Sequence, residues 1–194
     1  RIRDELEKML ASPRPGHGLL LLNESGLLPH VLPEWSLIPG AVNATAACLE
    51  RVAGKPAAVL WTTLLWDLGP DKADATLLRL RHSNQSRECV TSSLRVIPAI
   101  LALPDQDLAS EKRLLRQPFI PFALDALAVR LSVTGQSEEA VNHAWSKLHA
   151  WGHHDMFPTR MVDGNDAFKI GLRGPAIARG LKAVEDAQLR GDME

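Results

Sequence analysis

Apolar residues recur at helical spacing along almost the whole of this 194-residue chain. In the opening stretch, Ile2, Leu6, Met9 and Leu10 fall on one face of a helix with 3.6 residues per turn. No segment alternates apolar and polar residues convincingly, and the one strand-like piece, SSLRVI, is short and lies in a helical context. We therefore predict an elongated all-α assembly of about ten helices without a sheet.

Glycine, proline and short polar residues mark where these helices begin and end. Gly135 is predicted to end the apolar helix that precedes it. Either Asp107 or Ser110 is predicted to cap the start of the helix in DLASEKRLLRQP. Pro98 and Pro104 are predicted to interrupt the helical pattern, because proline lacks a backbone N–H group.

The composition is that of an ordinary globular protein, with 45% apolar and 23% charged residues. The net charge of −1 means that any contact with nucleic acid has to come from local patches. Cys48 and Cys89 form no CxxC motif, which favours a reducing compartment, so we expect a cytoplasmic protein. No apolar run has transmembrane length, so no membrane partner is expected. The amphipathic opening resembles the inside of a longer protein, although a removed leader or tag would look the same.

No catalytic signature is present: the sequence lacks GxGxxG, P-loop, HExxH and GxSxG patterns. His149 and His153 are four residues apart and could share a metal ion on one helix face. Gly152 lies between them, however, and is predicted to end the helix first, which favours surface or capping histidines. We expect no metal site, no catalytic residue and no cofactor in this chain.

Cations form three groups that could neutralise phosphates, although solvated helix faces would have the same pattern. The first, opposed nearby only by Glu88, comprises Arg79, Arg81, Arg87 and Arg95. The second comprises Lys112, Arg113 and Arg116. The third, which faces Asp163 and Asp166, comprises Arg160, Lys169, Arg173, Arg179 and Lys182.

The third group lies in the most patterned stretch, VDGNDAFKIGLRGPAIARGLKAV, at residues 162–184. Asp163 or Asn165 can cap a first helix, and Gly174 followed by proline can open a second. Free N–H groups at a helix start attract phosphate. Because acidic residues surround the first start, the second, with Arg173 and Arg179, is the better phosphate candidate.

Two stretches at opposite ends of the chain are similar to one protein family. RIRDELEKMLASPRPGHGLLLLNESGLLPHVLPE, residues 1–34, resembles the neck of bacterial tRNA nucleotidyltransferases (CCA-adding enzymes) and poly(A) polymerases. VDGNDAFKIGLRGPAIARGLKAVEDAQLRG, residues 162–191, resembles the tail of that family, with one residue fewer before its Gly-Pro turn. Together they cover about a third of the chain, in the order of the family.

The resemblance implies a neck-like pair of RNA-binding helices at residues 1–40, a helical body at 41–135 and a helical tail at 136–194. It implies that the chain holds tRNA, or another RNA 3′ end, through its phosphates. The implied catalyst is a separate head domain of the same enzyme, which would carry Mg²⁺ and the nucleoside triphosphate. The residues assigned to RNA or phosphate binding are Arg160, Lys169, Arg173, Gly174, Arg179, Lys182, Arg79, Arg81, Lys112 and Arg113.

The middle of the chain departs from the family pattern. Where many members have LLHDIGKP, a metal-binding motif of a phosphohydrolase-like domain, this chain has LLWDLGP, with Trp66 in the place of the histidine. Asp67 remains, but one aspartate cannot hold a divalent ion, so we expect no phosphohydrolase activity. The alternatives left open are a poly(A) polymerase-like RNA-binding region and a helical interaction scaffold without RNA binding.

Overall fold

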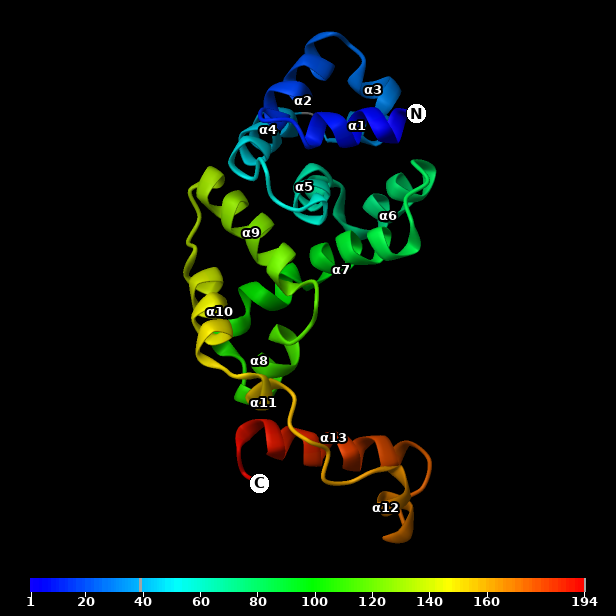
Figure 1. Cartoon of the computed structure of the whole chain (residues 1–194), viewed down its shortest axis with the longest axis vertical. Helices are drawn as coiled ribbons and strands as arrows, with labels where there is room; N and C mark the ends of the chain where they lie inside the picture. The colour runs from blue at the N-terminus through cyan, green and yellow to red at the C-terminus, as the bar shows by residue number, and fades with distance from the viewer. Residues whose placement is uncertain (39, 194) are drawn as a thin grey trace. The chain divides into compact units, whose positions relative to one another are not determined.

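The computed structural model in Figure 1 describes residues 1–38 and 40–193. These residues form thirteen α-helices, ten of them with seven or more residues, and three short 3₁₀ helices, with no strand among them. The predicted all-α fold is therefore confirmed. None of the described helices combines the length and the hydropathy that crossing a bilayer requires.

The chain packs as two units that interleave along the sequence. The first contains Arg1–Leu101 and Pro118–Val141, and the second contains Ala102–Gln117 and Asn142–Glu194. The predicted division into neck-like helices at residues 1–40, a body at 41–135 and a tail at 136–194 stays a prediction.

The helices of the first unit run from the N-terminus to the middle of the chain. They are α1 (Ile2–Leu10), α2 (Pro15–Glu24), α3 (Leu28–Val31), η1 (Pro33–Leu37), α4 (Ala41–Arg51), α5 (Ala57–Leu64), η2 (Trp66–Leu68), α6 (Gly69–Arg79), α7 (Asn84–Leu101) and α9 (Ile120–Thr134). The last of them ends at Gly135, whose φ of 66° is left-handed, so the predicted glycine stop is confirmed.

The core of the first unit is built around α5. All six residues from Val59 to Leu64 are buried, and α5 contacts α1, α4, α7 and α9. A helix that is apolar on all sides has no solvent face to present, so it takes the centre of a bundle. Trp61, 2% exposed, is the largest fully buried side chain there, which accounts for its place in an apolar helix.

Two neighbouring helices approach closely at a glycine. α2 packs on α4, and a Cβ atom at Gly16 would overlap the carbonyl oxygen of Ala46. The backbone N–H of His17 also donates to Glu50 Oε1 at 2.7 Å, which satisfies one of the free N–H groups at the start of α2. The glycine therefore sets the distance between α2 and α4.

One predicted interruption is wrong. α7 continues through Pro98 to Leu101 and contains the strand-like SSLRVI segment. Proline removes one helical hydrogen bond, but Val90, Leu94 and Ile100 of α7 are buried against the rest of the unit. The packing of this face outweighs the local preference of one residue.

The second unit contains η3 (Leu103–Asp105), α8 (Leu108–Leu115), α11 (His153–Met156), α12 (Gly164–Lys169) and α13 (Pro175–Arg190). It also holds α10 (Glu139–Ala150) from residue 142 onward. Asp107 caps α8, because its carboxylate accepts hydrogen bonds from the N–H groups of Ala109 and Ser110. Of the two predicted caps, Asp107 and Ser110, the first is therefore confirmed. α8 packs on α13, where Lys112 Nζ donates to the carbonyl of Leu189 at 2.8 Å.

Candidate nucleic-acid interface

Four arginines from two distant parts of the sequence meet at one hollow of the first unit. The hollow has a volume of about 280 Å³, and its lining residues are Arg1, Ile2, Arg3, Arg79, Leu80 and Arg81. Within the described part of the chain, no acidic side chain lines it. We call it the arginine hollow. Arg79 and Arg81 are predicted RNA contacts. Arg1 and Arg3 are not among the predicted contacts, and only the packing of α1 near the end of α6 brings them beside the other two.

Two of these four guanidinium groups are held by carboxylates. Arg79 donates to both oxygens of Glu34 at 2.8 Å, a bidentate pair. Arg3 donates to Asp4 at 3.0 Å and to the carbonyl of Arg81 at 2.9 Å. The side chains of Arg1 and Arg81 are exposed and have no bonded partner in residues 1–38 and 40–193. The arginine hollow thus offers two free positive charges.

The tail stretch folds as two capped helices in the second unit. Asp163, rather than Asn165, caps α12: it accepts from the N–H groups of Asn165 and Asp166, and Asp166 bonds back to its N–H in a capping box. α13 begins after Gly174, whose φ of 51° and ψ of −131° suit glycine, with Pro175 in the first turn. The predicted helix punctuation is confirmed.

The turn before α13 holds Arg173 against its own loop. Arg173 Nη1 donates to the carbonyls of Phe168 and Leu172 at 2.7 Å, and its guanidinium lies 3.7 Å from the centre of the Phe168 ring. Such a stacked cation keeps its charge at the surface while its orientation is restrained. Arg173 is exposed, so its other N–H groups remain available to an anion.

A second hollow, of about 350 Å³, lies between α13 and the segment before α12. Arg160 and Lys182 line it, together with the acidic Asp163 and Glu185. The side chains of Arg160, Lys182 and the nearby Arg179 are exposed, and none has a bonded partner in the residues described. Lys169, in contrast, pairs with Asp166 at 3.3 Å in a largely exposed ion pair, which stabilises little. We call Arg160, Arg179 and Lys182 the tail cations.

Comparison with known proteins places these surfaces in a family context. A family model described as "Probable RNA and SrmB- binding site of polymerase A" matches residues 1–38, the segment that supplies Arg1 and Arg3. A CC-adding tRNA nucleotidyltransferase of Thermus thermophilus is 28% identical over 233 aligned positions, which cover 98% of this chain and 53% of that protein. The chain is related to the C-terminal RNA-binding portion of the tRNA nucleotidyltransferase and poly(A) polymerase family.

This similarity confirms the resemblance that was found at the two ends of the sequence. The alignment with the Thermus protein also covers the middle of the chain. The chain spans about half the length of the curated relative that it matches. No solved structure matches the chain.

Two of the predicted RNA contacts, Lys112 and Arg113, are engaged inside the protein. Lys112 is buried and bonds to the last turn of α13, and Arg113 pairs with Glu185 at 3.1 Å and with Asp186. Burial alone would raise the pKa of Glu185, but hydrogen bonds from Arg116 and Arg113 outweigh it and hold that pKa below its ordinary value. Both cations join α8 to α13, and the carboxylates of Glu185 and Asp186 neutralise the charge of Arg113.

The interpretation that only Glu88 opposes the first cation group is wrong. Besides the pair between Arg79 and Glu34, Arg87 makes a bidentate pair with Asp74, at 3.0 and 2.7 Å. Arg95 lies 3.5 Å from Asp71. Asp71 and Asp74 lie on α6 and pair with arginines of α7, and Glu34 reaches Arg79 from η1. In this group Arg81 remains the unpaired cation among the described residues.

The position of the family's metal-binding motif is occupied by an ion pair. Asp67 Oδ1 accepts from Arg130 Nη2 at 2.6 Å, and Asp67 Oδ2 accepts from Thr45 Oγ1 at 3.2 Å. Arg130 also lies over the ring of Trp66, the residue that stands where the family has histidine, at 6.0 Å. A guanidinium therefore takes the role of counter-charge to Asp67.

The histidines near the end of the chain do not share a helix. α10 ends at Ala150 and α11 begins at His153, with Gly152 between them, as predicted. His149 stacks on Trp145 at 5.9 Å, and His153 stacks on Phe157 at 4.8 Å. Among the residues described, no three His, Cys, Asp or Glu side chains lie close enough to hold a metal ion.

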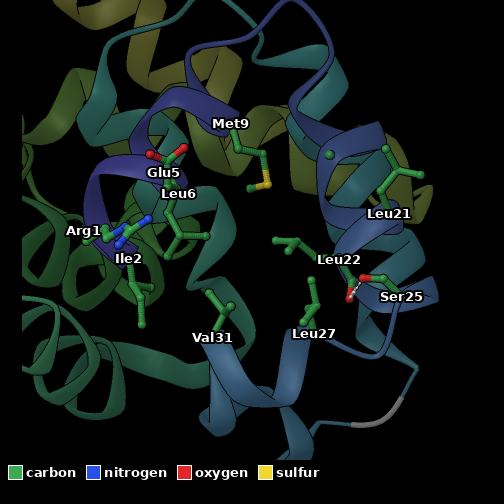
Figure 2. A pocket seen from close by; sticks show the side chains of 11 residues that line it. Arg1, Ile2, Glu5, Leu6, Met9, Leu21, Leu22, Ser25, Leu27 and Val31 are labelled. Atoms are coloured by element: carbon green, nitrogen blue, oxygen red, sulfur yellow. Dashed lines mark hydrogen bonds between the residues drawn. The ribbon is translucent and has the colours of Figure 1, made fainter.

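An apolar groove, which the sequence analysis did not find, opens between α1 and the α2–α3 segment (Figure 2). It has a volume of about 680 Å³ and includes Ile2, Met9, Leu21 and Leu27 in its lining. Ile2, Leu21 and Leu27 are each about half exposed, at 49%, 50% and 51%. Exposed aliphatic side chains gathered in one hollow are typical of a binding surface. The signal in the sequence was the run of four leucines in α2, which is too apolar for one buried stripe.

Proposed function

We propose that this chain binds tRNA and positions its 3′ end for a nucleotidyltransferase head domain of the same enzyme. The observation that carries the proposal is the set of tail cations, Arg160, Arg179 and Lys182, which are exposed and unpaired in the described residues. An enzyme that serves every tRNA needs contacts to phosphates and shape, because base readout would exclude substrates. The Thermus relative is a CC-adding tRNA nucleotidyltransferase, which supports tRNA as the RNA.

The catalytic chemistry is assigned to the head domain, with Mg²⁺ and nucleoside triphosphates as its cofactor and substrate. What this chain contributes is binding energy and orientation, which bring a flexible RNA end within reach of the catalyst. Arg160, before α12, and Lys182, on α13, line the same hollow, a placement that suits two phosphates of one backbone.

The test is tRNA binding by the full-length protein as salt is varied. Replacing Arg160, Arg179 and Lys182 by glutamine should lower the slope of log affinity against log salt by about two to three, since each phosphate that is no longer neutralised lowers it by about 0.7–0.9. A triple glutamine variant at Arg14, Lys72 and Arg190, which are also exposed, is the control. Equal slopes for the two triple variants, or no tRNA binding by the unaltered protein, would overturn the proposal.

A second function, docking of a protein helix, is favoured by the apolar groove. Ile2 and Met9 lie on one face of α1, and Leu21 and Leu27 lie across the groove (Figure 2). A cleft between two helices receives the apolar face of a third through side chains three or four residues apart. The family description, which names SrmB beside RNA, covers every residue of the groove. We propose an amphipathic helix of such a protein partner as the occupant.

Site-specific crosslinking tests this second function. A photoreactive residue at Leu21 in the full-length protein should crosslink to purified SrmB, whereas one at Leu78, 57% exposed but outside the groove, should not. A crosslink from Leu21 to another part of the same chain would show that the groove is covered internally. That result, or equal crosslinking at both positions, would reject the docking proposal.

A further inference from the structure

Arg81 has an unusual backbone conformation at the mouth of the arginine hollow. Its φ of 62° is left-handed, and it is the one residue other than glycine with a positive φ in residues 1–38 and 40–193. The N–H of Arg81 bonds to the carbonyl of Leu78, and the N–H of His82 bonds to the carbonyl of Leu77. This is the glycine-type ending of α6, at the position where helices most often have glycine.

A side chain at such a position destabilises the turn, because its Cβ atom crowds the backbone. Eight glycines in the described chain take a positive φ, so this protein uses glycine for most of its left-handed turns. An arginine in one of them gains no ion pair that would offset the strain, since its guanidinium is exposed and unpaired in the described residues. Strain held at an exposed, charged residue is a pointer to function.

A second contact holds this strained residue in place. Arg3 Nη1 donates to the carbonyl of Arg81 at 2.9 Å, across 78 residues of sequence. Arg3 itself is anchored by Asp4, and Arg79, two residues before Arg81, is fixed by Glu34. The two anchored arginines thus frame the hollow, and the two unpaired ones, Arg1 and Arg81, face solvent beside it.

We propose that the arginine hollow binds a backbone phosphate of RNA, with Arg81 as the contact residue and Arg3 as its positioning residue. The inference rests on the proposed function, because it takes RNA as the ligand. A phosphodiester presents two non-bridging oxygens, and two unpaired guanidinium groups at one hollow can bind both of them. The hollow adds a contact in the first unit to those of the tail cations.

Substitutions at position 81 separate charge from backbone strain. Arg81→Gly removes the guanidinium and relieves the turn, so it should raise the thermal midpoint and weaken tRNA binding about tenfold at low salt. Arg81→Gln should weaken binding equally without the gain in stability, and Arg81→Lys should retain most of the affinity. Arg14→Gln is the control, because Arg14 is exposed and lies outside the hollow but within residues 1–38, which the RNA-binding family model matches.

A double-mutant cycle tests the positioning role of Arg3. Arg3→Met should weaken binding in the protein that has Arg81 and should have no further effect in the Arg81→Gln variant. Equal effects in both backgrounds would mean that Arg3 does not act through Arg81.

All measurements use the full-length protein and intact tRNA. If that protein binds tRNA and Arg81→Gln binds as tightly as Arg14→Gln, the hollow is not a phosphate site, while the proposed function stands. If the unaltered protein does not bind tRNA, the proposed function fails and this inference fails with it.

Discussion

Arg130 and Asp67, 63 residues apart in sequence, form a hydrogen-bonded ion pair of 2.6 Å in the first unit. Each side chain is only 19% exposed, and the pair lies beside Trp66. A carboxylate in that setting needs a counter-charge. Here the guanidinium supplies it from α9.

Removing one member of this pair should destabilise the first unit. Arg130→Met would leave the Asp67 carboxylate largely buried without its cation, and we expect a loss of about 2 kcal/mol in the free energy of unfolding. Urea denaturation measures it. The double variant with Asp67→Leu should recover much of the loss, because no buried charge then remains; equal stability of the single and double variants would show that the two side chains do not stabilise each other.

Gly16→Ala should force α2 and α4 apart. The new Cβ atom would overlap the carbonyl oxygen of Ala46, which belongs to a helix backbone and cannot move aside alone. We expect a destabilisation of about 2 kcal/mol, measured by thermal or urea unfolding. Gly164→Ala, where an added Cβ meets nothing within 4 Å, is the control and should leave stability nearly unchanged. Equal effects of the two variants would contradict the close approach.

Lys112→Met should loosen the last turn of α13. The substitution keeps most of the apolar stem but removes the hydrogen bond to the carbonyl of Leu189, a loss of about 1–2 kcal/mol. Amide hydrogen exchange should therefore speed up in the last turns of α13 while α9, in the other unit, keeps its protection. Unchanged exchange in α13 would show that this hydrogen bond does not hold the helix end.

Stability should fall as the solution is acidified below about pH 6.5, and His82 should contribute to that fall. Burial disfavours the imidazolium and lowers the pKa of His82 below its ordinary 6.5. The unfolded chain therefore takes up this proton at a higher pH than the folded chain. The stabilisation that neutral His82 contributes is fully present above pH 6.5, and it is lost as the pH falls towards the pKa of His82 in the folded chain. Unfolding of His82→Gln across pH 5–7.5 should show a shallower dependence than the unaltered protein, and an identical dependence would exclude His82 as the cause.

The helix caps and the glycine stop predicted from the sequence are confirmed because each of them depends on residues only a few positions away. Asp107 and Asp163 cap helices through N–H groups two and three residues away, and Gly135 ends α9 by its own φ. The predicted break at Pro98 is wrong because the loss of one helical hydrogen bond competes with the burial of a whole face of α7. The residues next to Pro98 in the sequence do not show that burial. The leucines of α2 line a groove for the same reason: burial depends on what lies opposite.

The sequence by itself determined the helices, most of their ends and the family to which the chain is related, since each of these is encoded in short stretches of neighbouring residues. Only the tertiary structure decided which cations are free. Glu34 neutralises Arg79 from another helix, α13 takes up Lys112 and Arg113, and Arg81 is left unpaired in a left-handed turn. Charge pairing depends on distances of a few ångströms between segments far apart in the chain, and folding alone sets those distances.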